Sequence, residues 1–586
     1  MASLVPFRSP LGVYFRSALG VRDEGERQTP YIDFQITAPS GTNVWLMLGP
    51  SSIDRDFVFH PNVLAIREDG VIAGVTGKGT KLTHQQSGNG WYHGLPCDIW
   101  GQVLPRSRWG RDFRIVGSSD YLDEPCPVTG IRFNPTLSNI EFVDARHTLL
   151  NSLDVRPLKN LIKLWAGGTN NENYLLHLVY PEDFPAMTFE NARLAEIKIS
   201  NPDLEELILD LVQISTLAVG GMMNLKRFIL SKSKELDVLH MGGLLKLEEA
   251  QISHSKVHSC SFSDCFKLKE LSIFDCYPLT NLNISGCLSL ETLHIYGVRG
   301  WSFLNPINQS PTYGPGKYYE PFVLAANISK LDCSDLISLK NVKIDCCPLL
   351  EEIDFSECVS LEEFILKNNE SLQTITFKNN EDLIGNFVDD QWIYDEAQDG
   401  LYWFSSVPLI SYCGNLNSLD FSECPNLRYF KVTHCENFSS IDLSENLEIE
   451  AFAITRTALS GITLPSGGKW KRIYLAQNYL THINLGSLPT THGFDLNASH
   501  NNMPISEVRR IILAIYNHCV AHPLVRFGYL TLTWSEQWFD SAGNPDGPFL
   551  FDDPELYWPY WELVNEMGWS LNITFQPFPW DDNFPP

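Results

Sequence analysis

The sequence predicts a mainly β solenoid, preceded by a β-rich domain and followed by an α/β cap. Two observations carry this prediction: an 11-residue repeat that recurs through the chain, and an alternation between two kinds of repeat. Residues 339–382 divide into LKNVKIDCCPL, LEEIDFSECVS, LEEFILKNNES and LQTITFKNNED. Apolar residues at the first, fourth and sixth places predict a short strand that follows a turn. Further copies begin at Val257, Leu268, Leu279, Leu290, Leu416, Leu427 and Phe438.

Two repeats together make one coil of about 22 residues, because 11 residues are too few to enclose a core. One kind of repeat places an Asp and a Ser around an inward residue, as in SLDFSEC and SIDLSEN. Such side chains bond nearby backbone groups at a fixed turn. The other kind, as in TLHIYGV and YFKVTHC, varies at its outward positions. The alternation predicts one structural face and one ligand-facing face.

The ninth place of a repeat holds either Cys or Asn. We interpret it as a position where a small side chain sits inside a turn and bonds unpaired backbone groups of the neighbouring coil. Metal ligation would not tolerate the exchange of Cys for Asn. Disulfides between stacked coils, at a spacing of ~4.8 Å, are the other alternative. This structural turn ladder comprises Cys265, Cys276, Cys287, Cys347, Cys358, Asn369, Asn380, Cys424, Cys435 and Asn446.

The LxxLDxSxC pattern resembles the short leucine-rich repeats of bacterial surface proteins and of tailed-phage virion proteins. After the last repeat, LNASHNNMPISEVRRIILAIYN, GYLTLTW and PELYWPYWELVNEMGWSLNITF resemble the closing segment of phage structural proteins. That segment is a helix, a strand, a second helix ending in Gly-Trp, and a final strand. The resemblance covers roughly residues 131–576. It implies a leucine-rich repeat solenoid with an α/β cap, and a binding role whose partner it leaves open.

Composition and repeats divide the chain into five parts. Residues 1–28 are an arm rich in Arg, Phe and Pro, which either docks onto another subunit or is disordered until bound. Residues 29–130 predict a small antiparallel sandwich that loosely resembles immunoglobulin-like modules, with an irregular β-rich amino cap as the alternative. The solenoid spans 131–500 and the α/β cap 501–576. The acidic, Pro-rich tail 577–586 is expected to be an extended contact peptide.

Two insertions, 299–327 and 384–415, interrupt the solenoid and are rich in aromatic residues. Each follows a variable repeat, so we expect both to leave the same edge. Tyr and Trp are enriched at binding hot spots, and long loops often carry function; packing of these rings onto the solenoid flank is the alternative. The candidate contacts are the strand residues Phe274, His294, Tyr296, Lys343, Tyr429, Lys431 and Tyr474, and the insertion residues Trp301, Tyr318, Tyr319, Trp392, Tyr394 and Trp403.

The α/β cap begins with a helix for which Ser506 is the predicted N-cap. Val508, Ile511, Ile512 and Ile515 share one face of this helix. That face is expected to cover the end of the apolar column, which a solenoid would otherwise expose.

Charge and hydropathy exclude two classes of partner. The chain has 43 Lys and Arg residues against 70 Asp and Glu residues, and its formal net charge of −27 repels nucleic acid and anionic lipid. No window reaches the roughly 18 apolar residues of a membrane span. Arginines interrupt the apolar runs of the amino terminus, so a secretory signal is not expected either.

No motif predicts catalysis. GVTGKGTK fails the phosphate-loop template, because Ile72 and Gly79 stand where Gly and Ser or Thr are needed. His518 and His522 have ligand spacing on a helix, but no third ligand lies nearby in the sequence. Acidic residues around Asp389 in the second insertion could bind calcium or cleave a glycan, although a solvated loop is favoured. We therefore expect no enzyme activity, no metal and no cofactor.

The resemblance implies a non-enzymatic virion structural protein of a tailed phage: a fibre, a spike or a capsid decoration. Its solenoid face would bind other virion proteins or a host-surface receptor, either protein or glycan, within an oligomeric assembly. The protein would then be assembled into the virion in the host cytoplasm. The alternative is a bacterial cell-surface or effector adhesin of the leucine-rich repeat class that binds protein or glycan.

Overall fold

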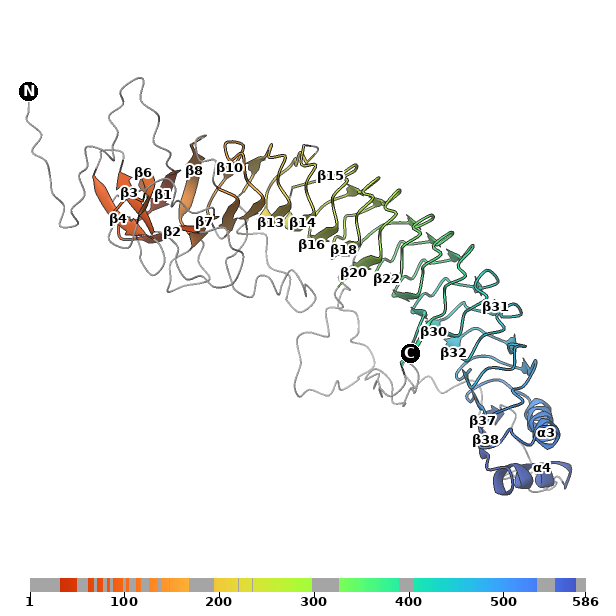
Figure 1. Ribbon diagram of the computed structural model, residues 1–586. Helices are drawn as coiled ribbons and strands as arrows, with labels where there is room; N and C mark the ends of the chain where they lie inside the picture. The colour runs from red at the N-terminus through yellow and green to blue at the C-terminus, as the bar shows by residue number, and fades with distance from the viewer. Residues whose placement is uncertain are drawn as a thin grey trace, which may run out of the picture. The chain divides into compact units, whose positions relative to one another are not determined.

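Two compact units make up the chain. A computed structural model (Figure 1) describes residues 32–49, 62–67, 71–76, 82–84, 88–97, 102–104, 112–116, 126–134, 140–167, 194–297, 326–388, 405–534 and 554–575, except positions 147, 220 and 234. Unit 1 comprises Met1–Cys287 with Val298–Val323, and unit 2 comprises Leu288–Gly297 with Leu324–Pro586. The predicted arm 1–28, the tail 577–586 and most of the first insertion lie outside the described residues.

The first strands of unit 1 pair antiparallel. Strand β1 (Ile32–Ala38) lies between β6 (Gly88–Cys97) and β8 (Val128–Phe133), and β6 also pairs with β3 (Asn62–Arg67). Period-two alternation buries Phe34 and Ile36 of β1 on one face. The remaining strands of this region are β2 (Asn43–Gly49), β4 (Ile72–Thr76), β5 (Leu82–Thr83) and β7 (Asp112–Val116). An immunoglobulin-like topology stays a prediction.

A parallel ladder follows in unit 1, where β7 pairs with β9 (Phe142–Arg146). Each later strand lies parallel to its predecessor. The wide sheet continues through β11 (Lys163–Gly167), β13 (Glu206–Val212), β14 (Arg227–Ser233), β16 (Glu249–Ser253) and β18 (Glu270–Phe274). The shorter strands are β10 (Ser152–Asp154), β12 (Glu196–Lys198), β15 (Val238–His240), β17 (Ser259–Ser261) and β19 (Asn281–Asn283).

Unit 2 has the same two rows of strands. Its wide sheet contains β20 (Thr292–Tyr296), β22 (Asn341–Asp345), β24 (Glu363–Lys367), β28 (Leu409–Ser411), β30 (Tyr429–Cys435), β32 (Ala451–Thr457), β34 (Arg472–Tyr474), β36 (Asp495–Ala498), β37 (Tyr529–Trp534) and β38 (Ser570–Phe575). The narrow sheets contain β21 (Lys330–Asp332), β23 (Glu352–Asp354), β25 (Thr374–Thr376), β29 (Ser418–Asp420), β31 (Ser440–Asp442), β33 (Gly461–Thr463) and β35 (His482–Asn484).

The register of these strands confirms the predicted coil length. Asn341 lies opposite Glu363, and Tyr429 lies opposite Ala451, so partners in neighbouring coils are 22 residues apart. The first-place leucines, such as Leu339 and Leu350, are completely buried between the two rows of strands. Burial of this apolar column is the main stabilising contribution, because each coil alone cannot bury its apolar face. The fold is a mainly β leucine-rich repeat solenoid.

The α/β cap has the predicted order of elements: α3 (Ile505–Ala521), β37, α4 (Pro554–Asn565) and β38. Val508, Ile511, Ile512 and Ile515 of α3 are buried, as expected from their spacing. The predicted N-cap is wrong, because Pro504 occupies that position and Ser506 lies within the first turn. Proline suits the start of a helix, since its φ of −68° already matches the helical value.

The second insertion is shorter than the sequence suggests. Strand β26 (Asn386–Val388) pairs antiparallel with β27 (Ser405–Val407), and residues 389–404 between them lie outside the described part of the chain. Strand β28 then pairs in parallel with β24 and β30, so the repeat resumes at Leu409 instead of Leu416. The template missed this repeat because Ser405 and Pro408 replace its first-place and fourth-place apolar residues.

Candidate functional site

Several ninth-place side chains bond the backbone of the preceding coil. Asn446 Nδ2 donates to the carbonyl oxygens of Phe421 and Cys424, at 2.8 and 2.9 Å. Cys358 Sγ lies 3.0 Å from the Cys333 carbonyl oxygen. All fourteen cysteines are buried and none forms a disulfide. These contacts are those expected of a lining position that accepts a thiol or an amide.

Some of the remaining ladder positions follow the same pattern. Thiols at Cys265, Cys276 and Cys287 point to carbonyl oxygens of the coil before, and Asn369 Nδ2 donates to Ile344 O at 3.1 Å. Asn380 is completely buried, yet neither its Nδ2 nor its Oδ1 has a hydrogen-bond partner. Cys347, Cys424 and Cys435 are also completely buried, and the thiols of Cys347 and Cys435 point to carbonyl oxygens of their own coil.

The narrow sheets of unit 2 present a constant face. Asp332, Asp354, Asp420 and Asp442 each accept a hydrogen bond from the backbone N–H two residues later, at 2.8–2.9 Å. This confirms the predicted turn role of the repeated Asp and Ser. Because their carboxylates are engaged by the chain itself, these outward residues offer little to a partner.

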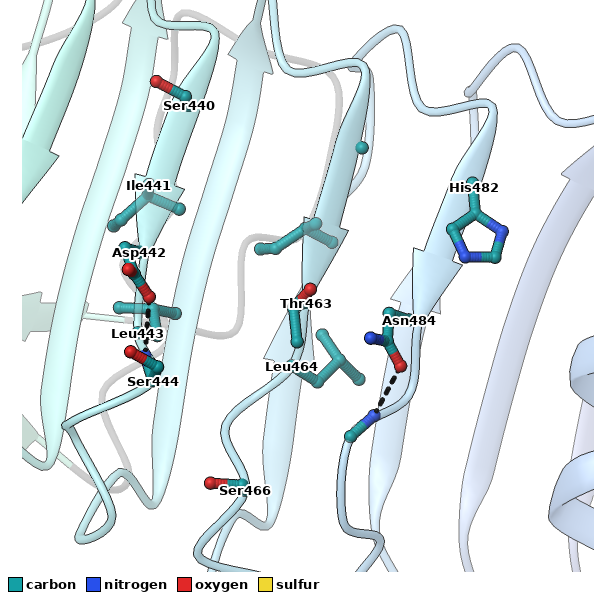
Figure 2. Close-up of a pocket in the computed structure, with 13 residues that line it drawn as sticks. Ser440, Ile441, Asp442, Leu443, Ser444, Thr463, Leu464, Ser466, His482 and Asn484 are labelled. Atoms are coloured by element: carbon teal, nitrogen blue, oxygen red, sulfur yellow. Dashed lines mark hydrogen bonds between the residues drawn. The ribbon is translucent and has the colours of Figure 1, made fainter.

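A shallow hollow of about 620 Å³ lies on this constant face, between β31, β33 and β35. Figure 2 shows its lining, including Asp442 and Asn484 with their turn hydrogen bonds. Its other polar lining residues include Ser440, Thr463 and His482. We assign this hollow no function, because Asp442 and Asn484 in its lining are engaged in their own turns.

The outward side chains of β20, β22, β24, β28, β30, β32, β34 and β36 form what we call the variable face of unit 2. Tyr296 and Lys343 meet on it, with the Lys343 ammonium 4.6 Å from the ring centroid of Tyr296. The His294 ring lies 6.2 Å from that of Tyr296, almost perpendicular to it. Burial, and next the charge of Lys343, lower the pKa of His294. Three of the predicted contact residues therefore form one aromatic and cationic group.

A second group surrounds two alanines on the same face. Ala451 and Ala453 of β32 are almost completely buried, and Tyr429 and Tyr474 pack against them from the strands on either side. Lys431 lies opposite Ala453 in β30. Small residues between two tyrosines create a shallow apolar floor with aromatic walls, a typical arrangement for a protein hot spot.

The predicted role of Phe274 is wrong. Its side chain is completely buried, with its ring 4.8 Å from that of His254 in the preceding coil. Phe274 occupies the seventh place, directly before Asp275, whose φ of 48° turns the chain out of the strand. A side chain at this turn packs on the neighbouring coil instead of pointing to solvent. The outward Ile208 and Ile229 of unit 1 are also completely buried, so the candidate face is that of unit 2.

An additional row of side chains, which the sequence interpretation missed, borders the variable face. We call Tyr412, His434, Arg456, Gln477 and His500 the edge row; each occupies the eighth place with a φ of 55–60°. The rings of Tyr412 and His434 stack with centroids 4.4 Å apart. Arg456 Nη1 lies 2.8 Å from His434 Nε2, and Arg456 Nε donates to Gln477 Oε1 at 2.7 Å. The signal available in the sequence was a large side chain at the eighth place, where several other repeats have Asp or Asn. The structure shows that this place has left-handed φ, which favours Gly or Asn.

Several predicted positions cannot be placed. The residues Trp301, Tyr318, Tyr319, Trp392, Tyr394 and Trp403 lie outside the described residues.

The two histidines with ligand spacing lie side by side on α3. His518 Nε2 lies 2.8 Å from the Pro489 carbonyl oxygen, and the His518 and His522 rings are 4.5 Å apart. Across the described ranges, no group of three His, Cys, Asp or Glu side chains is arranged to hold a metal ion. Nor does any described helix combine the length and apolarity needed to cross a membrane.

Comparison with known proteins finds similarity only among solved structures. No family model matches the chain, and no curated protein matches it. InlJ from Listeria monocytogenes, whose functional domain includes a cysteine ladder, is 16% identical, with coverage of 70% of this chain and 83% of that one and a TM-score of 0.28.

Two further bacterial structures are similar. The leucine-rich repeat protein LIC12759 from Leptospira interrogans is 13% identical, with coverage of 67% and 96% and a TM-score of 0.21. The internalin InlF from Listeria monocytogenes is 12% identical, with coverage of 62% and 89% and a TM-score of 0.20. At these values the similarity carries no argument about function.

Proposed function

We propose that this protein is a non-enzymatic recognition protein that binds a protein partner through the variable face of unit 2. The observation that supports this proposal most directly is the difference between the two faces. On the constant face, the Asp carboxylates accept hydrogen bonds from backbone N–H groups of their own turns. The variable face carries Tyr, His and Lys groups on a rigid parallel sheet. Rigid aromatic groups lose little entropy on binding and are enriched at hot spots.

Site-specific photocrosslinking tests this proposal. A benzoylphenylalanine at Tyr429 or Tyr474 is expected to capture one discrete protein partner, because these side chains flank the apolar floor at Ala453. The same group at Ser440 or Thr463 on the constant face is the matched control and should yield no adduct. Equal capture from both faces, or none from either variable-face position in native particles or on native cells, would contradict the proposal.

The finer proposal is a virion structural role in a tailed phage, as a fibre, a spike or a capsid decoration. Its support is the resemblance of the repeats and of the closing helix–strand–helix–strand segment to phage structural proteins. A bacterial surface or effector adhesin is the alternative. Mass spectrometry and antibody–gold labelling of purified phage particles distinguish them: signal on the particle supports the first, and signal confined to bacterial surfaces supports the second.

The insertion aromatics remain candidate contacts on sequence grounds. The double variant Trp392→Ala with Trp403→Ala is expected to abolish partner binding while changing the melting temperature by only a few degrees. Unchanged binding would remove the second insertion from the proposed interface. The variable-face proposal would stand, because it depends on other residues.

A further inference from the structure

We propose that Arg456 is an anion-binding residue that receives the carboxylate of an acidic side chain from the protein partner. This inference rests on the proposed recognition role for the identity of the partner. The carboxylate site itself can be tested without that partner. Arg456 is half-buried at the edge of the variable face, in the middle of the edge row.

The hydrogen bonds of Arg456 leave most of its donors available. A guanidinium has five N–H donors in a planar fork and no acceptor. Arg456 Nε donates to Gln477 Oε1 and Nη1 donates to His434 Nε2, and both partners are neutral in this arrangement. Within the described part of the chain, the side chain of Arg456 has no other hydrogen bond and no ion pair. The guanidinium is therefore held in place by groups that do not neutralise it.

The protonation state of His434 follows from the same contact. Because Arg456 can only donate, His434 Nε2 must accept, and the proton lies on Nδ1. Nδ1 lies 3.0 Å from Thr433 Oγ1, which in turn lies 2.8 Å from Thr455 Oγ1. This chain of hydrogen bonds fixes the His434 ring as a neutral acceptor. It orients the guanidinium without supplying a counter-charge.

Four of the five other arginines of unit 2 differ from Arg456 in this respect, and the fifth, Arg526, is exposed and donates to two backbone carbonyl oxygens. Arg428, Arg472, Arg509 and Arg510 each have a carboxylate oxygen within 2.6–3.7 Å. In a chain of net charge −27, a half-buried arginine without a carboxylate partner is exceptional. The positive charge of Arg456 also acts electrostatically on His500, another member of the edge row. Burial, and next the charge of Arg456, lower the pKa of His500.

The surroundings favour a carboxylate over a phosphate backbone. A carboxylate matches the planar fork of one guanidinium, and a single charge is less strongly repelled by an acidic chain than a polyanion is. The His434 ring lies beside the guanidinium, and the Tyr412 ring stacks on His434. They give the methylene groups of an Asp or Glu side chain an aromatic surface to pack against.

The test uses acetate as the probe and the His500 ring as the reporter. The full-length protein is labelled at histidine 13Cε1, the His500 signal is assigned with His500→Asn, and its pKa is measured by NMR at constant ionic strength. Acetate bound at Arg456 should partly cancel the field that lowers the pKa of His500. We therefore expect that pKa to rise in a saturable manner as acetate is added.

Two variants locate the effect. Arg456→Gln should raise the pKa of His500 without acetate and weaken the acetate response about tenfold or more, since a charge-assisted hydrogen bond is lost. Arg472→Gln is the matched control, because Arg472 is already near Asp495 at 3.6 Å, and its acetate response should equal that of the original protein.

Three outcomes would overturn the inference: no acetate response in the original protein, an equal response in Arg456→Gln, or tighter binding of phosphate than of acetate. None of these bears on photocrosslinking at Tyr429. Failure of the carboxylate site is thus distinguishable from failure of the proposed function.

Discussion

The side-chain amide of Asn446 donates a hydrogen bond to the backbone carbonyl oxygen of Phe421, 25 residues earlier, over 2.8 Å. One amide thereby joins two successive coils from inside the turn, where water cannot replace it. Asn380 occupies the equivalent place but makes no such bond. Comparing Asn446 with Asn380 therefore measures how much the ladder hydrogen bonds contribute to the stability of the solenoid.

We expect Asn446→Ala to lower the free energy of unfolding by about 1–3 kcal/mol, because it removes two buried hydrogen bonds that join neighbouring coils, although each carbonyl oxygen keeps a backbone N–H donor. Asn380→Ala should lower the free energy of unfolding much less, because the Asn380 amide is buried without hydrogen-bond partners. For the same reason, Asn380→Cys should leave the free energy of unfolding unchanged or raise it. Urea denaturation of both variants checks this. Equal losses at the two positions would show that the hydrogen bonds do not account for the difference.

Glu507 of α3 predicts acid sensitivity of the α/β cap. Burial alone would raise the pKa of Glu507, but hydrogen bonds from Arg510, from the Ile483 N–H and from His482 lower it to about 2. The folded state therefore binds this proton less readily than the unfolded state does. The stabilisation is complete above about pH 4.5 and is lost as the pH falls towards 2.

The measurement is the free energy of unfolding as a function of pH. In Glu507→Gln, the free energy of unfolding should depend less on pH below about 4.5. It should also be lower at neutral pH, because Arg510 loses its bidentate carboxylate partner. Arg509→Gln is a suitable control, because its ion pair with Glu555 is exposed. If the free energy of unfolding of Glu507→Gln fell in acid as steeply as that of the original protein, the assigned pKa would be contradicted.

Phe274 is expected to act as a core residue. Because the Phe274 ring is completely buried, Phe274→Ala should lower the free energy of unfolding by about 3–5 kcal/mol. Tyr474→Ala on the variable face should cost less and should instead weaken partner binding. Thermal unfolding and binding of both variants separate the two roles. A stable Phe274→Ala variant that fails to bind would restore Phe274 as a contact.

The cysteines should be unreactive in the native protein. Burial raises the pKa of Cys276 and of Cys358 to about 12, and thiolates are the reactive form. We expect thiol reagents to modify none of the fourteen cysteines rapidly at neutral pH, and all of them in denaturant. Fast modification of any ladder cysteine in the native state would show that its coil opens or that its thiol is exposed.

The sequence by itself determined the repeat, the coil length and the lining role of the ninth place. Leu339 and Leu350 lie where an 11-residue template puts them, because inward positions are set by strand and turn geometry within one coil. The order of elements in the α/β cap was predicted from the resemblance of its sequence to the closing segment of phage structural proteins. Only the length of the second insertion escaped the template, since Pro408 replaces an aliphatic residue at the start of β28.

The tertiary structure decided what happens where neighbouring coils meet. Whether Phe274 faces solvent, and whether Arg456 meets His434, depends on side chains about 22 residues away at the edge of the sheet. Periodicity cannot report those contacts, because it repeats the same position in every coil without specifying how unlike side chains pack against each other. The fold therefore follows from the pattern, and the candidate site follows from the stacking of particular coils.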